Sequence, residues 1–188
     1  MIYVLAFLIT ATTTGFLVRA NSKVAIIVGA LILASFAALR GSDVAADFLV
    51  YQDWYSSRDL GSGFLERPGL FEAVYFLLND FFEAGGIPFR GFVWFLAFIA
   101  VLMKIRVIVS FAKNGWSVGV SVLIYALTFY LLHDFTQVRA GLAIAFIFLA
   151  VRSLVNGNRT HFALFVLIAT GFHSSALMAF LLLLPHRG

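Results

Sequence analysis

The stretch RGSDVAADFLVYQDWYSSRDLGSGFLERPGLFEAVYFLLNDFFEAGGIPFR (residues 40–90) contains eight of the nine carboxylates of the chain, together with four arginines. Long apolar runs lie on both sides of it, and their few charged side chains are almost all basic. Such an uneven distribution of charge is typical of a membrane protein in which a long polar loop lies on one side of the bilayer. The polar chemistry of the protein is therefore expected in this stretch.

The composition supports the same class. Hydrophobic residues make up 62% and charged residues 12% of the sequence, and the mean hydropathy is +1.01, whereas soluble proteins contain roughly 25% charged residues. We expect an all-α, polytopic membrane helix bundle that forms a single membrane domain over residues 1–188, with 40–90 as a helical extracytoplasmic loop. The basic residues are dispersed, so the pI of 9.7 indicates biased loop charge and no nucleic-acid partner. No cysteine is present, which excludes disulfides and thiol chemistry.

Six runs are candidates for membrane spans, because a bilayer core of about 30 Å needs roughly 20 apolar residues in a helix. They cover residues 2–18, 24–39, 92–112, 117–132, 140–155 and 162–184. The third run carries Lys104 and Arg106. An alternative is that this helix crosses over residues 87–103 and leaves its basic end at the interface, where long side chains reach the headgroups.

Basic residues near the ends of spans predict the orientation, because they are retained in the cytoplasm. Those after the first, third and fifth runs fall on one face: Arg19, Lys23, Lys104, Arg106, Lys113, Arg152 and Arg159. With that face inside, both termini, the 40–90 loop and the 133–139 turn are expected outside.

The first half of the 40–90 loop predicts a helix that carries acids and aromatics on one face. If Ser42 caps it, then four side chains fall within about 80 degrees on the helical wheel: Asp43, Asp47, Tyr51 and Trp54. Because the whole loop is rich in aromatic residues, we expect it to lie on or dip into the outer leaflet.

A second loop helix is expected over residues 68–84, because Pro68 is a favoured first helical residue. Its apolar surface is broad, and Glu72, Asn79 and Glu83 share a polar face. This pattern is typical of an interfacial or re-entrant helix. The alternative for both polar stripes is a solvated face with no further role.

Two polar residues in the later runs are informative, because burial of such side chains in hydrocarbon is costly. Arg139 opens the fifth run, and the alternative to a functional role is an arginine that reaches the interface. His173 lies near the middle of the sixth run beside Gly171, Ser174 and Ser175, which weaken the helix locally and suggest a polar cavity. The alternative for His173 is a hydrogen bond to a neighbouring helix.

Four ordered motifs resemble those of the EpsG family, which comprises Wzy-like membrane proteins of exopolysaccharide and capsule assembly. They are RGSD (40–43) followed by Asp47, Tyr51 and Tyr55; RPGLFE (67–72); QVRAGLA (137–143); and FHSSAL (172–177). Family members are typically longer, with further spans after the histidine, so the likeness is to the N-terminal part of a typical member.

The resemblance implies a polysaccharide polymerase, a glycosyltransferase of the bacterial cytoplasmic (inner) membrane. It would join polyprenyl-diphosphate-linked oligosaccharide units on the outer face, in contact with membrane lipids and with other polysaccharide-export proteins. No metal-ligand cluster, phosphate-binding loop or nucleophile elbow is visible, and we expect neither a metal nor a cofactor. The alternative function is a non-enzymatic lipid-linked glycan transporter or a scaffold subunit of the same pathway.

The candidate residues suit that chemistry. A diphosphate leaving group needs cations, and guanidinium groups bind phosphate oxygens through two parallel hydrogen bonds; the candidates are Arg40, Arg67 and Arg139. The acceptor hydroxyl needs a base, and the candidates are Asp43, Asp47, Glu72 and His173. Asp43 is the first choice because it is closest to Arg40.

Aromatic residues complete the predicted site. Tyr51, Trp54 and Tyr55 could stack on sugar rings, or they could form an aromatic belt at the interface. We expect all of the candidates to converge on one outward-facing cavity. His173 can join it only if the cavity is deep or the helix breaks near Gly171.

Overall fold

The computed structural model describes residues 8–9, 12–13, 23–42, 44, 47–56 and 72–184, and all regular structure among these residues is helical. This confirms the all-α fold. The elements are α2 (Lys23–Ala38), α3 (Asp47–Ser56), α4 (Ala73–Ala84), α5 (Phe89–Phe111), α6 (Gly115–Tyr125), η2 (Ala126–Asp134), α7 (Val138–Val155), α8 (Arg159–Thr170) and η3 (Ser174–Leu183). The η2 segment is a π-helix that continues α6, and η3 is a 3₁₀-helix.

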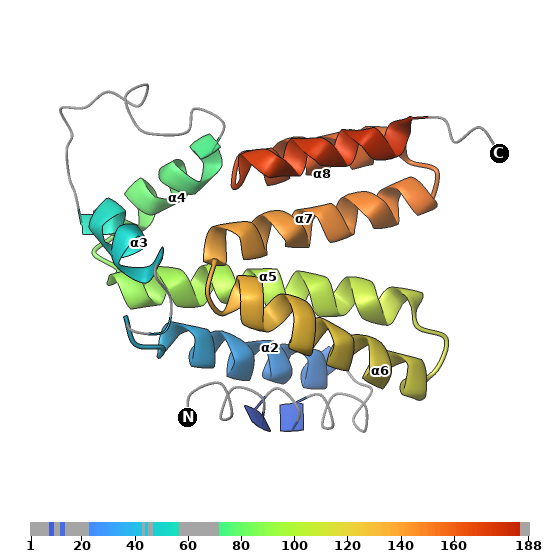
Figure 1. Ribbon diagram of the computed structural model, residues 1–188, viewed down its shortest axis with the longest axis horizontal. Coiled ribbons are helices and arrows are strands. Elements are labelled where there is room, and N and C mark those ends of the chain that lie inside the picture. The colour runs from blue at the N-terminus through green and yellow to red at the C-terminus, as the bar shows by residue number, and fades with distance from the viewer. Residues whose placement is uncertain are drawn as a thin grey trace.

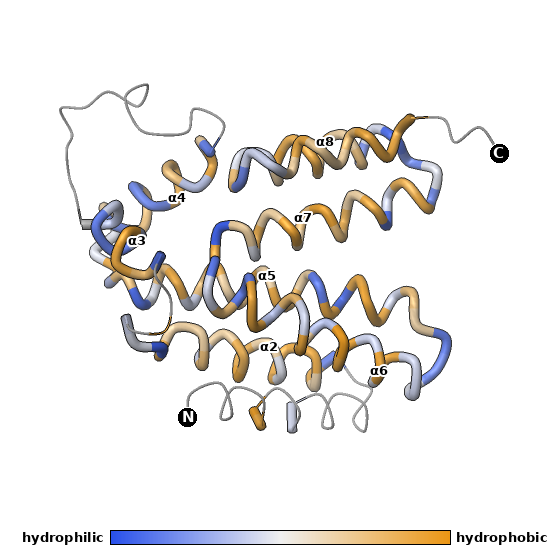
Figure 2. Tube along the Cα trace, viewed as in Figure 1, coloured by the Kyte–Doolittle hydropathy of each residue, from blue (hydrophilic) through white to orange (hydrophobic). Residues whose placement is uncertain are grey.

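The helices α2, α5, α7 and α8 lie side by side in that order, and α6 with η2 runs obliquely over one face of this layer (Figure 1). The shorter helices α3 and α4 gather at one end of it. Among the described residues, three helices are long and apolar enough to cross a bilayer, spanning Phe89–Phe111, Gly115–Asp134 and Val138–Val155, and α2, α8 and η3 are shorter apolar helices. Figure 2 shows apolar residues along most of each long helix and polar residues at the turn between α5 and α6. The result is the expected membrane helix bundle.

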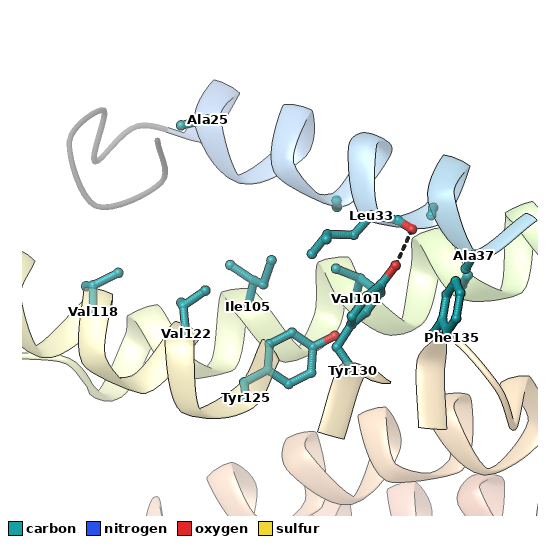
Figure 3. Packing of buried hydrophobic residues seen from close by; sticks show 13 residues of the cluster. Ala25, Leu33, Ala37, Val101, Ile105, Val118, Val122, Tyr125, Tyr130 and Phe135 are labelled. Carbon is teal, nitrogen blue, oxygen red and sulfur yellow. Dashed lines mark hydrogen bonds between the residues drawn. The ribbon is translucent and has the colours of Figure 1, made fainter. Parts of the chain in front are cut away.

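The first core cluster joins α2 to α5, α6 and η2 (Figure 3). Small side chains on α2, including Ala30, Ala34 and Ala37, are fully buried and allow the close helix approach that is common in membranes. The Tyr130 hydroxyl donates a hydrogen bond of 2.8 Å to the Leu33 carbonyl oxygen. That bond ties η2 to α2 and satisfies a phenol that would otherwise be buried without a partner.

An ion pair lies inside the bundle. Lys104 and Asp134 are both fully buried, with Nζ 2.5 Å from Oδ1, and the Tyr125 hydroxyl donates to the other Asp134 oxygen at 2.7 Å. Gly141 makes room for Asp134, because a Cβ there would lie 2.6 Å from Oδ1. The third run therefore forms one helix that contains Lys104 and continues to Phe111, close to the expected 92–112. The alternative, in which the span ends near residue 103 and Lys104 reaches the interface, was wrong, because the charge of Lys104 is satisfied within the bundle.

The sixth apolar run is a hairpin and not the single straight span that we expected. The chain turns after α8, and η3 returns alongside it (Figure 1). Phe162 near the start of α8 packs edge-to-face on Phe180 near the end of η3, with ring centroids 6.0 Å apart. Arg159 and Leu183 consequently lie at the same end of the bundle. The local break near Gly171, which the composition suggested, is the cause of the reversal.

Other expectations are met in part. The helix expected to be capped by Ser42 begins instead at Asp47, and Ser42 is in a turn. The second loop helix ends at Ala84 as expected. The 133–139 turn lies inside the protein, where Asp134, Phe135 and Val138 are buried. Most of the first expected span and the start of the 68–84 helix fall outside the described residues, and the orientation in the membrane remains a prediction.

Candidate functional site

The site is built where the tip of the α8–η3 hairpin meets the start of α4. The backbone amides of Val74 and Tyr75 both donate to the Gly171 carbonyl oxygen, at 3.0 and 3.2 Å. These bonds satisfy amide groups that have no partner within the first turn of α4. The contact is too close for a side chain at position 171, because a Cβ on Gly171 would lie 2.4 Å from Cγ2 of Val74. The residues just before α4 and η3 are thereby held together.

Glu72 is the centre of the site. It occupies the N-cap position of α4, where a carboxylate is favoured by the helix dipole, and it is buried. One carboxylate oxygen, Oε2, accepts a hydrogen bond from the Arg139 guanidinium. The other, Oε1, lies 3.2 Å from Nδ1 of His173. Glu72 therefore links the start of α7 to the tip of the hairpin.

Three aromatic rings surround the Arg139 guanidinium. Its central carbon lies 4.7 Å from the ring centroid of Trp54, 5.1 Å from that of Tyr51 and 5.4 Å from that of Tyr75. Cation–π attraction is strengthened when the cation is desolvated, and the Arg139 side chain is only 14% exposed. Arg139 is thus an enclosed cation that is paired with a carboxylate.

Burial fixes the protonation of the surrounding phenols. It raises the pKa of Tyr51 above its ordinary value of 10, against the opposing effect of Arg139. It also raises the pKa of Tyr75, for which the nearby Arg139 again opposes the shift. Both hydroxyls therefore remain protonated at neutral pH, so neither is suited to accept a proton from a substrate.

His173 is partly accessible, with 37% of its side chain exposed. It borders a pocket of about 310 Å³, which His133, Gln137 and Ser175 also line. The volume is in the range of small-molecule sites. A titratable side chain held by a buried carboxylate thus faces a space that a ligand could occupy.

Arg40 lies in a neighbouring cluster with a structural role. Its side chain is 1% exposed and donates to the carbonyl oxygens of Ala37 and Thr136, at 3.2 and 3.3 Å. Arg90 donates to the Ala38 and Arg40 carbonyl oxygens. The two arginines thus satisfy carbonyl groups at the end of α2.

The structure brings together part of the predicted set. Glu72, Arg139, His173, Tyr51 and Trp54 form one group.

The other predicted residues are not bonded to this group. Asp47 lies in the first turn of α3, close enough to both Arg40 and Tyr51 for its charge to act on them. Tyr55 is buried, donates to the Ile87 carbonyl oxygen and packs on Phe89, so its ring is not available for a sugar. Asp43 and Arg67 lie outside the described residues, and their roles remain predictions.

Sequence reasoning missed Tyr75, His133 and Gln137. Tyr75 reads as part of an apolar helix surface, although its place three residues after Glu72 could have indicated that both face the same side. His133 and Gln137 stand four residues apart around the 133–139 turn, which was considered only for its side of the membrane. Within the part of the chain that is described, no group of three or more His, Asp or Glu side chains could hold a metal ion.

Comparison with known families gives one finding. The sequence pattern of the EpsG family matches residues 23–187, which is most of the chain. No curated protein and no solved structure matches it.

Proposed function

This chain belongs to the EpsG family, and from that premise we propose that it is a Wzy-like polymerase of the cytoplasmic membrane that joins polyprenyl-diphosphate-linked oligosaccharide units. Family membership is consistent with a role in polysaccharide synthesis. The single observation that carries the catalytic proposal is the contact of Glu72 with His173 beside a pocket.

His173 is the proposed general base. When Nδ1–H of the imidazole donates to Glu72, the carboxylate fixes the tautomer and leaves Nε2 able to accept a proton. The acceptor hydroxyl gives its proton to Nε2 as its oxygen forms a bond to the anomeric carbon of the growing glycan. The bond from that carbon to the diphosphate breaks, and the polyprenyl diphosphate leaves with the electron pair. Glu72 stabilises the imidazolium that results.

The proposed role of Arg139 is to orient the Glu72 carboxylate. Its guanidinium contacts the second carboxylate oxygen, and the rings of Trp54 and Tyr51 hold it in place. The carboxylate is thus oriented by a planar cation with several N–H donors. Arg139 can also attract a nearby diphosphate through its charge. Arg40 is buried, so Arg67 is the other predicted arginine that could contact the diphosphate.

The proposal is tested in cells that depend on this protein for polymer. His173→Gln should abolish polymer and cause lipid-linked single units to accumulate, because an amide cannot act as a base at neutral pH. His161→Gln is the matched control, since His161 is an exposed histidine on the same hairpin. If the His173→Gln protein is present in the membrane at the wild-type level and polymer is normal, His173 is not the base. That result would favour a scaffold or a transporter.

A further inference from the structure

The pocket beside His173 has one polar end and one apolar end. The polar side chains are His133, Gln137, His173 and Ser175, whereas further along the pocket the lining is formed by alanine and isoleucine. Two imidazole rings, one amide and one hydroxyl therefore gather at the polar end.

The α7 side of the pocket is one continuous stripe. Gln137, Ala140, Ile144 and Ile147 all line it, and their spacing of three or four residues places them on one face of the helix. From Gln137 to Ile147 this face extends about 15 Å, from a rise of about 1.5 Å per residue.

The η3 side of the pocket is also one face of a helix. It is lined by His173, Ala176 and Ala179. These residues recur at every third position, which is the repeat of a 3₁₀-helix. The pocket is therefore an elongated space between two helices, with small side chains along it and His173 at its polar end.

We propose that this pocket binds the first isoprenoid units of the donor polyprenyl diphosphate, with the diphosphate at the polar end. The inference rests on the proposed function. The bond broken in that reaction joins the anomeric carbon directly to the diphosphate, so the lipid of the donor must lie beside the base. The lipid of the acceptor is separated from its reacting hydroxyl by the sugars of the unit.

The chemistry of the two ends fits this occupant. The Gln137 amide and the Ser175 hydroxyl at the polar end can donate hydrogen bonds to phosphate oxygens, which leaves Nε2 of His173 free to accept the proton. A branched apolar chain gains little by leaving one hydrocarbon environment for another, so its binding in a membrane depends on close packing. The alanines leave space between α7 and η3, and Ile144 and Ile147 provide branched surfaces for such packing.

The test uses a polyprenyl diphosphate of four isoprene units with a diazirine on the second unit, added to the purified full chain in nanodiscs. Labelling should map to the stretch 140–147 of α7 and to η3. Excess unlabelled polyprenyl diphosphate should compete, and the corresponding alcohol should compete poorly because it lacks the diphosphate.

Ile144→Trp should lower the labelling about tenfold or more, because the indole fills the space of the chain. Ile144 is only partly buried, so the change should leave the fold intact. Leu164→Trp is the matched control, since Leu164 is 49% exposed on α8 and does not line the pocket. Labelling spread over all lipid-facing helices, or Ile144→Trp labelled like the wild type, would overturn the assignment.

Polymer synthesis, measured with the same preparations, separates the two proposals. If the wild-type protein makes polymer but the probe labels residues outside the pocket, the pocket is not the lipid site, and the proposed function still stands. Labelling in the pocket without polymer from any preparation would reject the polymerase and leave lipid binding standing.

Discussion

Glu72 and His173 lie 101 residues apart in sequence, and Oε1 of one is 3.2 Å from Nδ1 of the other. Each residue occupies the N-cap position of a short helix, α4 for Glu72 and η3 for His173. The Gly171 carbonyl oxygen accepts both amide hydrogen bonds that join these two helix starts. A backbone contact thus fixes the geometry of a side-chain pair.

Gly171→Ala should separate this pair. The added Cβ would lie 2.4 Å from Val74, and overpacking of this kind costs typically about 1–3 kcal/mol. We expect faster amide hydrogen exchange at Val74 and Tyr75 and a lower thermal transition. Gly85→Ala is the control, because its Cβ would meet atoms only at ordinary distances of 3.4 Å or more. Equal exchange in both variants would show that the tip is not held in this way.

Arg139→Lys should shorten the polymer although it keeps the positive charge. Lysine lacks the planar guanidinium that contacts Glu72 and lies among three rings, so the carboxylate is held less firmly. Polymer length on gels measures the effect, with accumulation of lipid-linked single units as the second readout. Arg152→Lys, an exposed change in the last turn of α7, should have no effect. A wild-type length distribution for Arg139→Lys would remove Arg139 from the site.

Breaking the Lys104–Asp134 pair should destabilise the bundle. Both side chains are fully buried, and removal of one partner from a buried pair typically costs about 3–5 kcal/mol. Lys104→Met and Asp134→Asn should each lower the thermal transition in detergent.

The double variant Lys104→Met/Asp134→Leu should recover most of that loss, because apolar replacement of a whole buried pair is often neutral. Single variants as stable as the wild type would mean that the pair contributes little to the fold.

The hairpin predicts that Asn156 and Leu184 lie on the same side of the membrane. The chain contains no cysteine, so single cysteines at these positions and at Asp53 can be labelled without background. An impermeant thiol reagent should reach Asp53→Cys in intact cells, and Asn156→Cys and Leu184→Cys only after permeabilisation. If only one of Asn156→Cys and Leu184→Cys is labelled in intact cells, the two positions lie on opposite sides of the membrane, and the sixth run is a straight span.

The sequence predicted the helical membrane fold well, because long apolar runs in a bilayer have few alternatives to helix. The bounds of α2 and α7 differ from the expected spans by at most two residues at either end. The run over 162–184 was misjudged because apolar composition does not distinguish a straight span from two short helices that fold back. Gly171 and His173 carried the signal, since they interrupt the apolar run.

The site was predicted in part. Arg139 and His173 were identified by their polarity in apolar runs and Glu72 as a carboxylate on the polar face of the second loop helix, but their mutual contacts depend on how α4 docks on the hairpin. The role of Asp134 was missed for a related reason. As the carboxylate outside the 40–90 stretch it was conspicuous, yet its pairing with Lys104 follows from the packing of α5 against η2 and has no local sequence signature.

The central claim is that Glu72 and His173 act as one unit, and a double-mutant cycle on the rate of polymerisation tests it most directly. The assay uses reconstituted protein and purified lipid-linked units, with Glu72→Gln, His173→Gln and the combination, and with Asp53→Asn as an exposed control on α3. Loss of the base should lower the rate by about 10²–10⁴-fold. Glu72→Gln should lower it substantially, and the double variant should be no slower than His173→Gln alone. The account would be contradicted if the loss of rate in the double variant equalled the product of the two single losses. It would also be contradicted if Glu72→Gln had the wild-type rate.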